Sequence, residues 1–464
     1  LPGPLITAEL APDNLLQSYA ANRNRTDQDI WGASIVVTRD SGDSSLKFIG
    51  AYRGLRSHVA TDDDGFYYQL EGNDLRVRQS QFSGELQYNG VAGRLAYTAG
   101  LNAFTEMPRL LPTRPQPDIF YTCGCLSPDF LDPLESETRR IRTLSYAGYA
   151  QASVKLGERL SATVGARLTR ELKTLDGATY AVNADLRPTG PTLREGHAKD
   201  AWNSFTFRAG VEYQATADFM AFGSVARGFK SGGFNVRGQA NLPNMGFAPF
   251  DPETALTFEI GLRSEWLRRR LRVNATMFDT EYKNIQLRQL TEVGEIFTTL
   301  IENAARARIT GAEFELAAVP FDGLTVTAAY GHLKPTYLDV GNVLDLTLHS
   351  RFQRTPRNSF TASLNYAAAL PVGTLEGQID YSFRSKEQFQ ILAAINDQAA
   401  YALIGARVTF RAPRDRWNVS LFSTNLADRR YRTAGRGTLV EHAGFAYSSI
   451  GLPRQVGIEL STAF

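Results

Sequence analysis

The most chemically suggestive stretch of the sequence is a glycine-rich tract with basic side chains, Arg227-Gly228-Phe229-Lys230-Ser231-Gly232-Gly233-Phe234-Asn235. Glycines around a lysine can cradle a phosphate group, but a nucleotide loop needs a strand before it and a helix after it. Here the chain continues as Val236-Arg237-Gly238 into an Asn- and Pro-rich stretch, which does not predict a helix. We therefore expect a rim loop, in which glycines turn the backbone sharply out of a strand. The candidate ligand-binding residues are Arg227, Lys230, Asn235 and Arg237.

The two cysteines stand close together, as Cys123-Gly124-Cys125 in a proline-rich stretch. One C-x-C pair lacks the four ligands of a structural zinc site, and no histidine lies near it. A disulfide formed after export is the favoured interpretation. A pair of free thiols and a metal site are the alternatives.

No other grouping of side chains predicts a metal site, a cofactor site or an enzyme. The run Asp62-Asp63-Asp64 has carboxylates that suit calcium, but a solvated loop tip is the simpler interpretation. The histidines fall in or beside expected loops and lack the spacing of metal ligands on one element; they are His58, His197, His332, His349 and His442. No Ser/His/Asp or Cys/His grouping pairs a nucleophile with its base. We expect no catalytic residues, no cofactor and no bound metal.

Composition excludes further classes of protein. The chain has 464 residues with 50 Lys+Arg and 48 Asp+Glu, so its charge gives no reason to expect nucleic acid as a partner. No apolar run approaches the roughly 18–20 residues of a membrane-spanning helix, which argues against a helical inner-membrane protein. Aromatic residues are plentiful, with 27 Phe and 19 Tyr, whereas Met, His and Cys are sparse. This bias suits exported β-structure.

The last segment of the chain alternates strictly. Val456, Ile458, Leu460, Thr462 and Phe464 share one parity, and Gln455, Gly457, Glu459, Ser461 and Ala463 share the other. A strand would turn one set toward an apolar environment and the other toward a wet one. In an outer-membrane barrel these environments are the lipid and the lumen. Phe464 is then expected to be the assembly signal read by the barrel-assembly machinery.

The same period of two recurs along the whole chain and predicts about seventeen strands. They are expected at residues 31–39, 45–55, 76–88, 93–105, 142–155, 160–172, 202–214, 218–229, 253–266, 270–283, 304–318, 324–333, 358–369, 374–384, 400–411, 417–425 and 453–464. Very short turns alternate with long polar links, as they do in bacterial outer-membrane barrels. The expected fold is all-β, a large antiparallel transmembrane β-barrel.

Three groups of motifs resemble the barrel of the TonB-dependent outer-membrane receptors. The first is the glycine-rich tract with Phe250-Asp251-Pro252-Glu253 and Phe258-Glu259-Ile260-Gly261-Leu262. The second is Asn303-Ala304-Ala305-Arg306, continuing to Glu315. The third is Asn425-Leu426-Ala427-Asp428-Arg429-Arg430-Tyr431, followed by Gly451-Leu452-Pro453-Arg454. Their order along the chain is also that of the family, so the set is more specific than any single motif.

The resemblance implies a 22-stranded barrel filled by an N-terminal plug domain that contacts TonB. Counting strands back from the end assigns residues 1–30 to an external loop and residues 31–464 to the barrel domain, with the plug and five strands absent. The chain is thus expected to be a fragment of the parent receptor. The implied function is TonB-dependent import of a scarce ligand across the cell outer membrane of a Gram-negative bacterium, most often a ferric siderophore. The implied partners are TonB, the ligand and outer-membrane lipid.

Several alternatives stay open. A passive porin-like channel, a surface adhesion or phage-receptor module, and an importer of cobalamin, sugars or aromatic compounds would all suit a large barrel. The run Phe410-Arg411-Ala412-Pro413 resembles a motif of haem receptors in this family. It runs into a short turn expected on the periplasmic side, so we interpret it as a coincidence.

Overall fold

The structure is a computed structural model that describes residues 24–62, 72–111, 135–182, 188–235, 247–293, 296–341, 346–390, 395–436 and 447–462. Within these ranges no helix has the length and apolar character needed to cross a membrane. Strands account for nearly all of the regular structure, and a 3-10 turn at Pro413–Asp415 interrupts them near the end. The all-β fold class predicted from the sequence is confirmed.

Seventeen strands form one sheet. They are β1 (Arg25–Ser41), β2 (Ser44–Asp62), β3 (Gly72–Ala92), β4 (Leu95–Leu110), β5 (Glu135–Lys155), β6 (Leu160–Val182), β7 (Pro188–Thr216), β8 (Phe219–Lys230), β11 (Glu253–Trp266), β12 (Leu271–Val293), β13 (Ile296–Ala318), β14 (Leu324–Asp339), β15 (Asn358–Leu370), β16 (Gly373–Arg384), β17 (Tyr401–Arg411), β18 (Trp417–Thr424) and β21 (Gln455–Thr462). Two short pairs lie outside it, β9 (Gly233–Phe234) with β10 (Pro249–Phe250) and β19 (Arg432–Arg436) with β20 (Tyr447–Ile450). Each predicted strand corresponds to one strand of the sheet.

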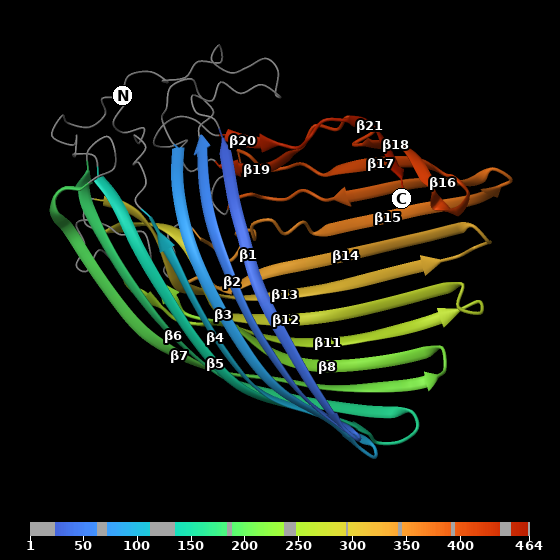
Figure 1. Ribbon diagram of the computed structural model, residues 1–464, viewed down its shortest axis with the longest axis horizontal. Coiled ribbons are helices and arrows are strands. Elements are labelled where there is room, and N and C mark those ends of the chain that lie inside the picture. The colour runs from blue at the N-terminus through green and yellow to red at the C-terminus, as the bar shows by residue number, and fades with distance from the viewer. Residues whose placement is uncertain are drawn as a thin grey trace, which may run out of the picture.

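The sheet is a continuous antiparallel meander. Each strand pairs with the next one along the chain, and the ladder passes directly from β8 to β11 and from β18 to β21. The sheet curls strongly, so that β1 and β2 cross in front of the middle strands in Figure 1. In the described part of the chain, β1 pairs only with β2 and β21 pairs only with β18. The two edge strands therefore do not close the sheet on each other.

Short turns gather at one end of the sheet and long links at the other, as Figure 1 shows. The link between β1 and β2 and the link between β15 and β16 are two residues each, 42–43 and 371–372. Both lie at the end where β21 finishes. We call the opposite end, with the long links, the mouth.

Several strands reach further toward the mouth than the sequence predicted. β6 and β7 continue through residues expected to be loop, and so do β12 and β13, whose pairing extends to Val293 and Ile296. β1 begins at Arg25, inside the expected external loop of residues 1–30. A strand of 23 residues such as β6 spans about 76 Å at roughly 3.3 Å per residue, well beyond a tilted crossing of about 9–11 residues. These strands therefore project past the bilayer as paired hairpins.

The two faces of the sheet differ as the alternation predicted. On β21 the side chains of Val456, Ile458 and Leu460 are exposed to 67%, 75% and 67% on the outer, apolar face. On the inner face Arg407 donates a hydrogen bond to Glu459 at 2.9 Å. Because paired residues share a face, the register carries this assignment from strand to strand. The outer face meets lipid, and the inner face lines a polar lumen.

Buried apolar clusters form at the mouth, where links fold back onto the inner face. One contains Leu175, Ala198 and Trp202 of the wall together with Phe234 and Phe247. The other contains Ile285, Ala305, Ala307, Tyr337 and Leu346. Tyr337 stacks on Phe352 of the link between β14 and β15, with ring centroids 4.2 Å apart. The link between β8 and β11 and the link between β14 and β15 thus cover part of the lumen entrance.

Candidate functional site: the mouth and the inner wall

The glycine-rich tract leaves the top of β8 and packs directly against the inner wall. Phe234 lies against Trp202 of β7, with ring centroids 5.8 Å apart. A Cβ on Gly232 would stand 2.4 Å from the Trp202 ring and 2.5 Å from the Phe250 carbonyl oxygen. This close approach of backbone to an aromatic ring requires glycine. The tract is a rim loop, as the sequence predicted, and no helix follows it in the described residues.

Lys173 holds the tract from below. Its Nζ donates to the Gly232 carbonyl at 2.7 Å, lies 2.9 Å from Glu171, and stands 5.7 Å from the centre of the Trp202 ring. The side chain is half-buried. Sequence reasoning missed Lys173 because it assigned the residue to a loop. The only sequence signal for it was that Glu171 and Lys173 stand two positions apart and would therefore share a face if the strand continued.

Asn235 joins the tract to a distant strand. Its side-chain amide accepts from Ile301 N at 2.6 Å and donates to Ile301 O at 3.1 Å, which lies on β13. Asn303 makes the parallel connection, accepting from Asp251 N and donating to Asp251 O at 2.5 and 2.7 Å. The first and second groups of motifs described in the sequence analysis are therefore in direct contact, through Asp251 and Asn303. We call these two connections the mouth bracket.

The candidate ligand-binding residues divide by position. Arg227 pairs with Leu256 and Phe207 on the outer face, so its side chain faces away from the lumen. Lys230 is exposed at the inner rim and pairs in register with Glu253. Asn235 is buried with its amide engaged in the mouth bracket, so it positions the loop. Arg237 lies outside the described residues, as do Cys123, Cys125 and Phe464.

The third motif clamps the mouth end of the last strands. The amide of Asn425 donates to the carbonyls of Arg429 and Leu452 at 2.9 and 3.1 Å and accepts from Arg429 N at 2.8 Å. Asp428 accepts from Arg454 N at 2.9 Å, and this N–H lowers the pKa of the Asp428 carboxyl. The clamp ties the link after β18 to the start of β21.

Replacement of Asn425 by alanine should release this clamp. Asn425 has a φ of 47°, a left-handed conformation that asparagine adopts more readily than alanine. The backbone groups of Arg429 and Leu452 would also lose their hydrogen bonds to its buried amide. We expect the free energy of unfolding in lipid vesicles to fall by about 1–3 kcal/mol, measured by urea titration. Asn418→Ala on β18, the strand that Asn425 directly follows, is the control. Equal stability of the two variants would contradict the clamp.

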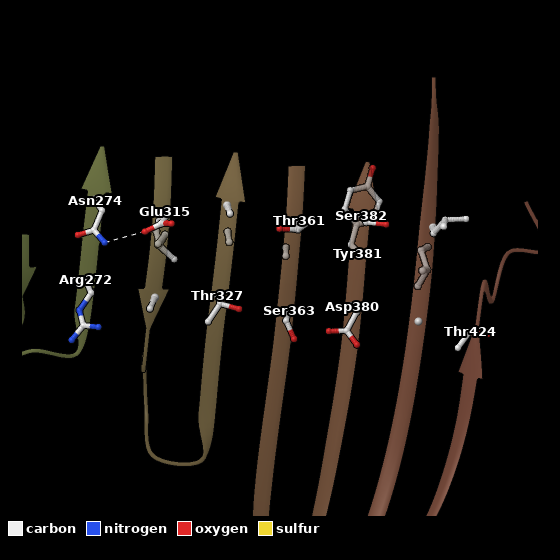
Figure 2. Close-up of a pocket in the computed structure, with 18 of the residues that line it drawn as sticks. Arg272, Asn274, Glu315, Thr327, Thr361, Ser363, Asp380, Tyr381, Ser382 and Thr424 are labelled. Atoms are coloured by element: carbon white, nitrogen blue, oxygen red, sulfur yellow. Dashed lines mark hydrogen bonds between the residues drawn. The ribbon is translucent and has the colours of Figure 1, made fainter. Parts of the chain in front are cut away.

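A hollow of about 700 Å³ lies on the inner wall across β12–β18. Figure 2 shows polar side chains of the hollow, which come from neighbouring strands. Asn274 donates to Glu315 at 3.1 Å, while Arg272, Thr327, Ser363 and Asp380 line the rest. Hydroxyl, amide and charged groups here offer hydrogen bonds to a polar solute or a polar protein surface. In the described ranges no three His, Cys, Asp or Glu residues gather as a metal site.

The run Phe410-Arg411-Ala412-Pro413 lies at a short turn. β17 ends at Arg411, and the 3-10 turn follows at Pro413–Asp415. The Arg411 guanidinium is bound to Glu376 of β16 at 2.8 Å on the lumen side. This is the short-turn end predicted from the sequence, opposite the mouth.

Comparison with known proteins identifies the family of this β-sheet domain. Residues 5–426 match the family described as TonB dependent receptor-like, beta-barrel. The chain belongs to this family. It is therefore an outer-membrane β-barrel of a receptor family whose members are not enzymes.

Individual relatives agree with this assignment. The chain is 26% identical over 252 residues to the pesticin receptor of Yersinia pestis, covering 54% of this chain and 35% of the relative. It is 22% identical over 289 residues to the ferric-pyoverdine M114 receptor of a Pseudomonas species, covering 62% of this chain and 33% of the relative. The matched regions thus span about a third of the length of these curated relatives.

Solved structures share the fold. The ferric yersiniabactin uptake receptor from Yersinia pestis superposes with a TM-score of 0.77 at 20% identity, over 94% of this chain and 61% of that one. The siderophore receptor from Acinetobacter baumannii gives a TM-score of 0.71 at 16% identity, over 94% of this chain and 64% of that one. At these identities the likeness concerns the fold.

Proposed function

We propose that this TonB-dependent receptor barrel serves the import of a ferric siderophore across the outer membrane. The observation that carries the proposal is a polar lumen whose mouth is narrowed by links anchored through the mouth bracket. The names of similar proteins support a ferric siderophore as the cargo, since they include a ferric-pyoverdine receptor and a ferric yersiniabactin uptake receptor.

In this proposal the mouth captures the chelate and the lumen passes it on. Lys230, exposed at the inner rim, is the ligand contact that we keep from the sequence analysis. Its charge would attract an anionic ferric complex. Lys173, Trp202 and Asn235 act indirectly, because they fix the loop that presents Lys230. No covalent bond to the cargo forms or breaks.

We also propose that the complete receptor has a plug domain and further strands beyond this chain. Within the described ranges the outer edges of β1 and β21 have no strand beside them, which supports this, since lipid cannot satisfy an open strand edge. The polar hollow on β12–β18 would then face the plug. The plug would contact TonB, which draws on the proton gradient of the inner membrane.

Uptake of radioactive iron in iron-limited cells tests the function. Cells with and without the gene would receive a panel of ferric siderophores, each with and without a protonophore. We expect one chelate class to lose energy-dependent uptake in the deletion strain. Uptake that persists with the protonophore would favour a passive channel. Unchanged uptake of every chelate would overturn the proposal of iron import. Import of cobalamin or sugars, or a surface binding role without transport, would then remain as alternatives.

A further inference from the structure

The short turn between β11 and β12 has an unusual backbone. Leu267, Arg268 and Arg269 have φ values of 54°, 57° and 66°, so successive residues with side chains are left-handed. L-residues other than glycine adopt this conformation only at a cost. Other short turns of the sheet have glycine at left-handed positions, namely Gly42, Gly93, Gly323 and Gly373. Backbone strain of this kind is often tied to function, so arginine in these positions needs an explanation.

The next short turn anchors the turn between β11 and β12. The Arg270 carbonyl accepts a hydrogen bond from Val319 N at 2.7 Å, and the Arg270 guanidinium is bound to Asp322 at 2.9 Å. Val319 and Asp322 belong to the link between β13 and β14. The left-handed turn is therefore held against its neighbour, and its remaining side chains start from a fixed backbone.

The carboxylate that lies closest to this turn is already bound. Glu265 contacts Arg269 at 3.2 Å and Arg272 at 2.9 Å. Arg268 is exposed, and among the described residues it has no ion pair. One guanidinium group of the turn is thus available to bind an anion from outside the chain.

The turn between β17 and β18 repeats this arrangement. Arg414 and Asp415 are left-handed, with φ values of 61° and 52°. Arg411, at the end of β17, is bound to Glu376 at 2.8 Å. Arg414 and Arg416 are exposed, and in the part of the chain that the structure describes neither has an ion pair. These two arginines flank Asp415, so the turn keeps a net positive charge.

We call the turn between β11 and β12 and the turn between β17 and β18 the basic turns. Both lie at the end of the sheet opposite the mouth, as Figure 1 shows. Short turns of outer-membrane barrels face the periplasm. From one basic turn to the other the sheet advances by six strands, which is about 29 Å along the rim at about 4.8 Å per strand. The free guanidinium groups therefore stand at separated points of the periplasmic rim.

This spacing favours an extended anion over a small one. Guanidinium groups bind carboxylates through paired hydrogen bonds. The periplasm contains the peptidoglycan layer, a glycan polymer whose peptide stems carry free carboxylates at intervals. Such a polymer can contact both basic turns at once, so that weak contacts reinforce one another. A small anion reaches only one basic turn at a time.

We propose that the basic turns bind the stem-peptide carboxylates of peptidoglycan through Arg268, Arg414 and Arg416. The contact holds the periplasmic rim of the barrel against the cell wall. It uses the end of the sheet opposite the mouth and does not depend on which cargo the receptor imports.

The test measures sedimentation of the full-length receptor, in discs of phosphatidylethanolamine, with isolated peptidoglycan sacculi freed of bound protein. We expect Arg268→Gln/Arg414→Gln/Arg416→Gln to weaken binding about tenfold, as three exposed ion pairs acting together would. Raising the salt concentration from about 50 to about 300 mM should weaken binding by the unaltered receptor as well. Sacculi whose carboxylates have been converted to amides should bind as weakly as the triple variant binds untreated sacculi.

A charge-matched control lies at the mouth end of the sheet. Arg56→Gln/Arg78→Gln/Arg109→Gln removes the same charge from exposed side chains of β2, β3 and β4 that lie in register with one another. This control should change binding to sacculi less than about twofold. An effect as large as that of the first triple variant would reduce the contact to overall charge and overturn the proposal.

Arg268→Gly separates binding from stability. Glycine adopts a φ near 57° without strain, so this variant should unfold at the same or a higher urea concentration than the unaltered receptor. It should nevertheless bind sacculi more weakly. Equal binding by the unaltered receptor and the Arg268→Gln/Arg414→Gln/Arg416→Gln variant would overturn the proposal. So would competition by phosphatidylglycerol vesicles as strong as that by sacculi, which would assign the basic turns to the inner leaflet.

Discussion

Replacement of Ile379 by arginine should prevent or severely weaken insertion of the barrel. Ile379 is 53% exposed on the outer face of β16, six residues from Gly373, where the strand begins after the short turn. Six residues on a strand tilted near 45° lie about 14 Å into the membrane, close to the midplane. An arginine at that depth on the lipid face of a barrel costs about 2–4 kcal/mol. We expect a corresponding loss in the free energy of folding into vesicles.

Gln378 supplies the matched control. It is the neighbouring residue on β16 but faces the lumen, where its amide donates to Asp380 at 3.0 Å. Gln378→Arg should fold within about 1 kcal/mol of the unaltered protein, because the lumen is hydrated. The measurement is urea-dependent folding into vesicles, followed by the heat-dependent shift in gel mobility of the folded barrel. Equal penalties for the two variants would show that the two faces have been assigned wrongly.

The sequence predicted the two faces of the wall correctly where one face must be apolar in order to contact lipid. On β21 every outer position is apolar or Thr, so the period of two is unbroken. Near the mouth this constraint ends, because strands that project into water need no apolar face. The pairs Asp279–Arg308 and Glu281–Arg306 stand on the outer parity of β12 and β13. Both pairs lie inside the predicted strands 270–283 and 304–318, and it is beyond them, up to Val293 and from Ile296, that the two strands continue through residues predicted to be loop.

The candidate site was harder to predict, because its contacts join distant parts of the chain. Asn235 and Ile301 are 66 residues apart, and no local pattern indicates that they meet. The motifs of the family were recognised, but their order does not reveal that they bind one another.

The facing of Arg227 shows the same limit on a smaller scale. Its charge and its glycine neighbour made it a candidate ligand contact, but parity alone could not say which face it takes. Pairing with Leu256 and Phe207 places it with apolar outer-face residues. Lys230 is an odd number of positions further along β8 and therefore lies on the inner rim.

Replacement of Gly232 by alanine should disable the mouth while sparing the wall. Its Cβ would collide with the Trp202 ring and with the backbone oxygen of Phe250, and backbone cannot move aside cheaply. The Phe234 side chain would leave its cluster, and the hydrogen bond from Lys173 to the Gly232 carbonyl would lengthen or break. Overpacking of this kind costs about 1–3 kcal/mol. We expect the affinity for the transported chelate to fall about tenfold or more.

Gly228→Ala is the control within the same tract, since a Cβ at Gly228 meets nothing within 4 Å. Binding of the chelate by both variants would be measured on purified full-length receptor, with trypsin cleavage after Lys230 as a second readout. Gly232→Ala should bind weakly and be cleaved faster, while both variants keep the gel mobility of a folded barrel. If Gly232→Ala is cleaved faster but binds normally, the loop is packed as described and does not present the ligand contact. If neither property changes, the tight packing of the tract against Trp202 is wrong.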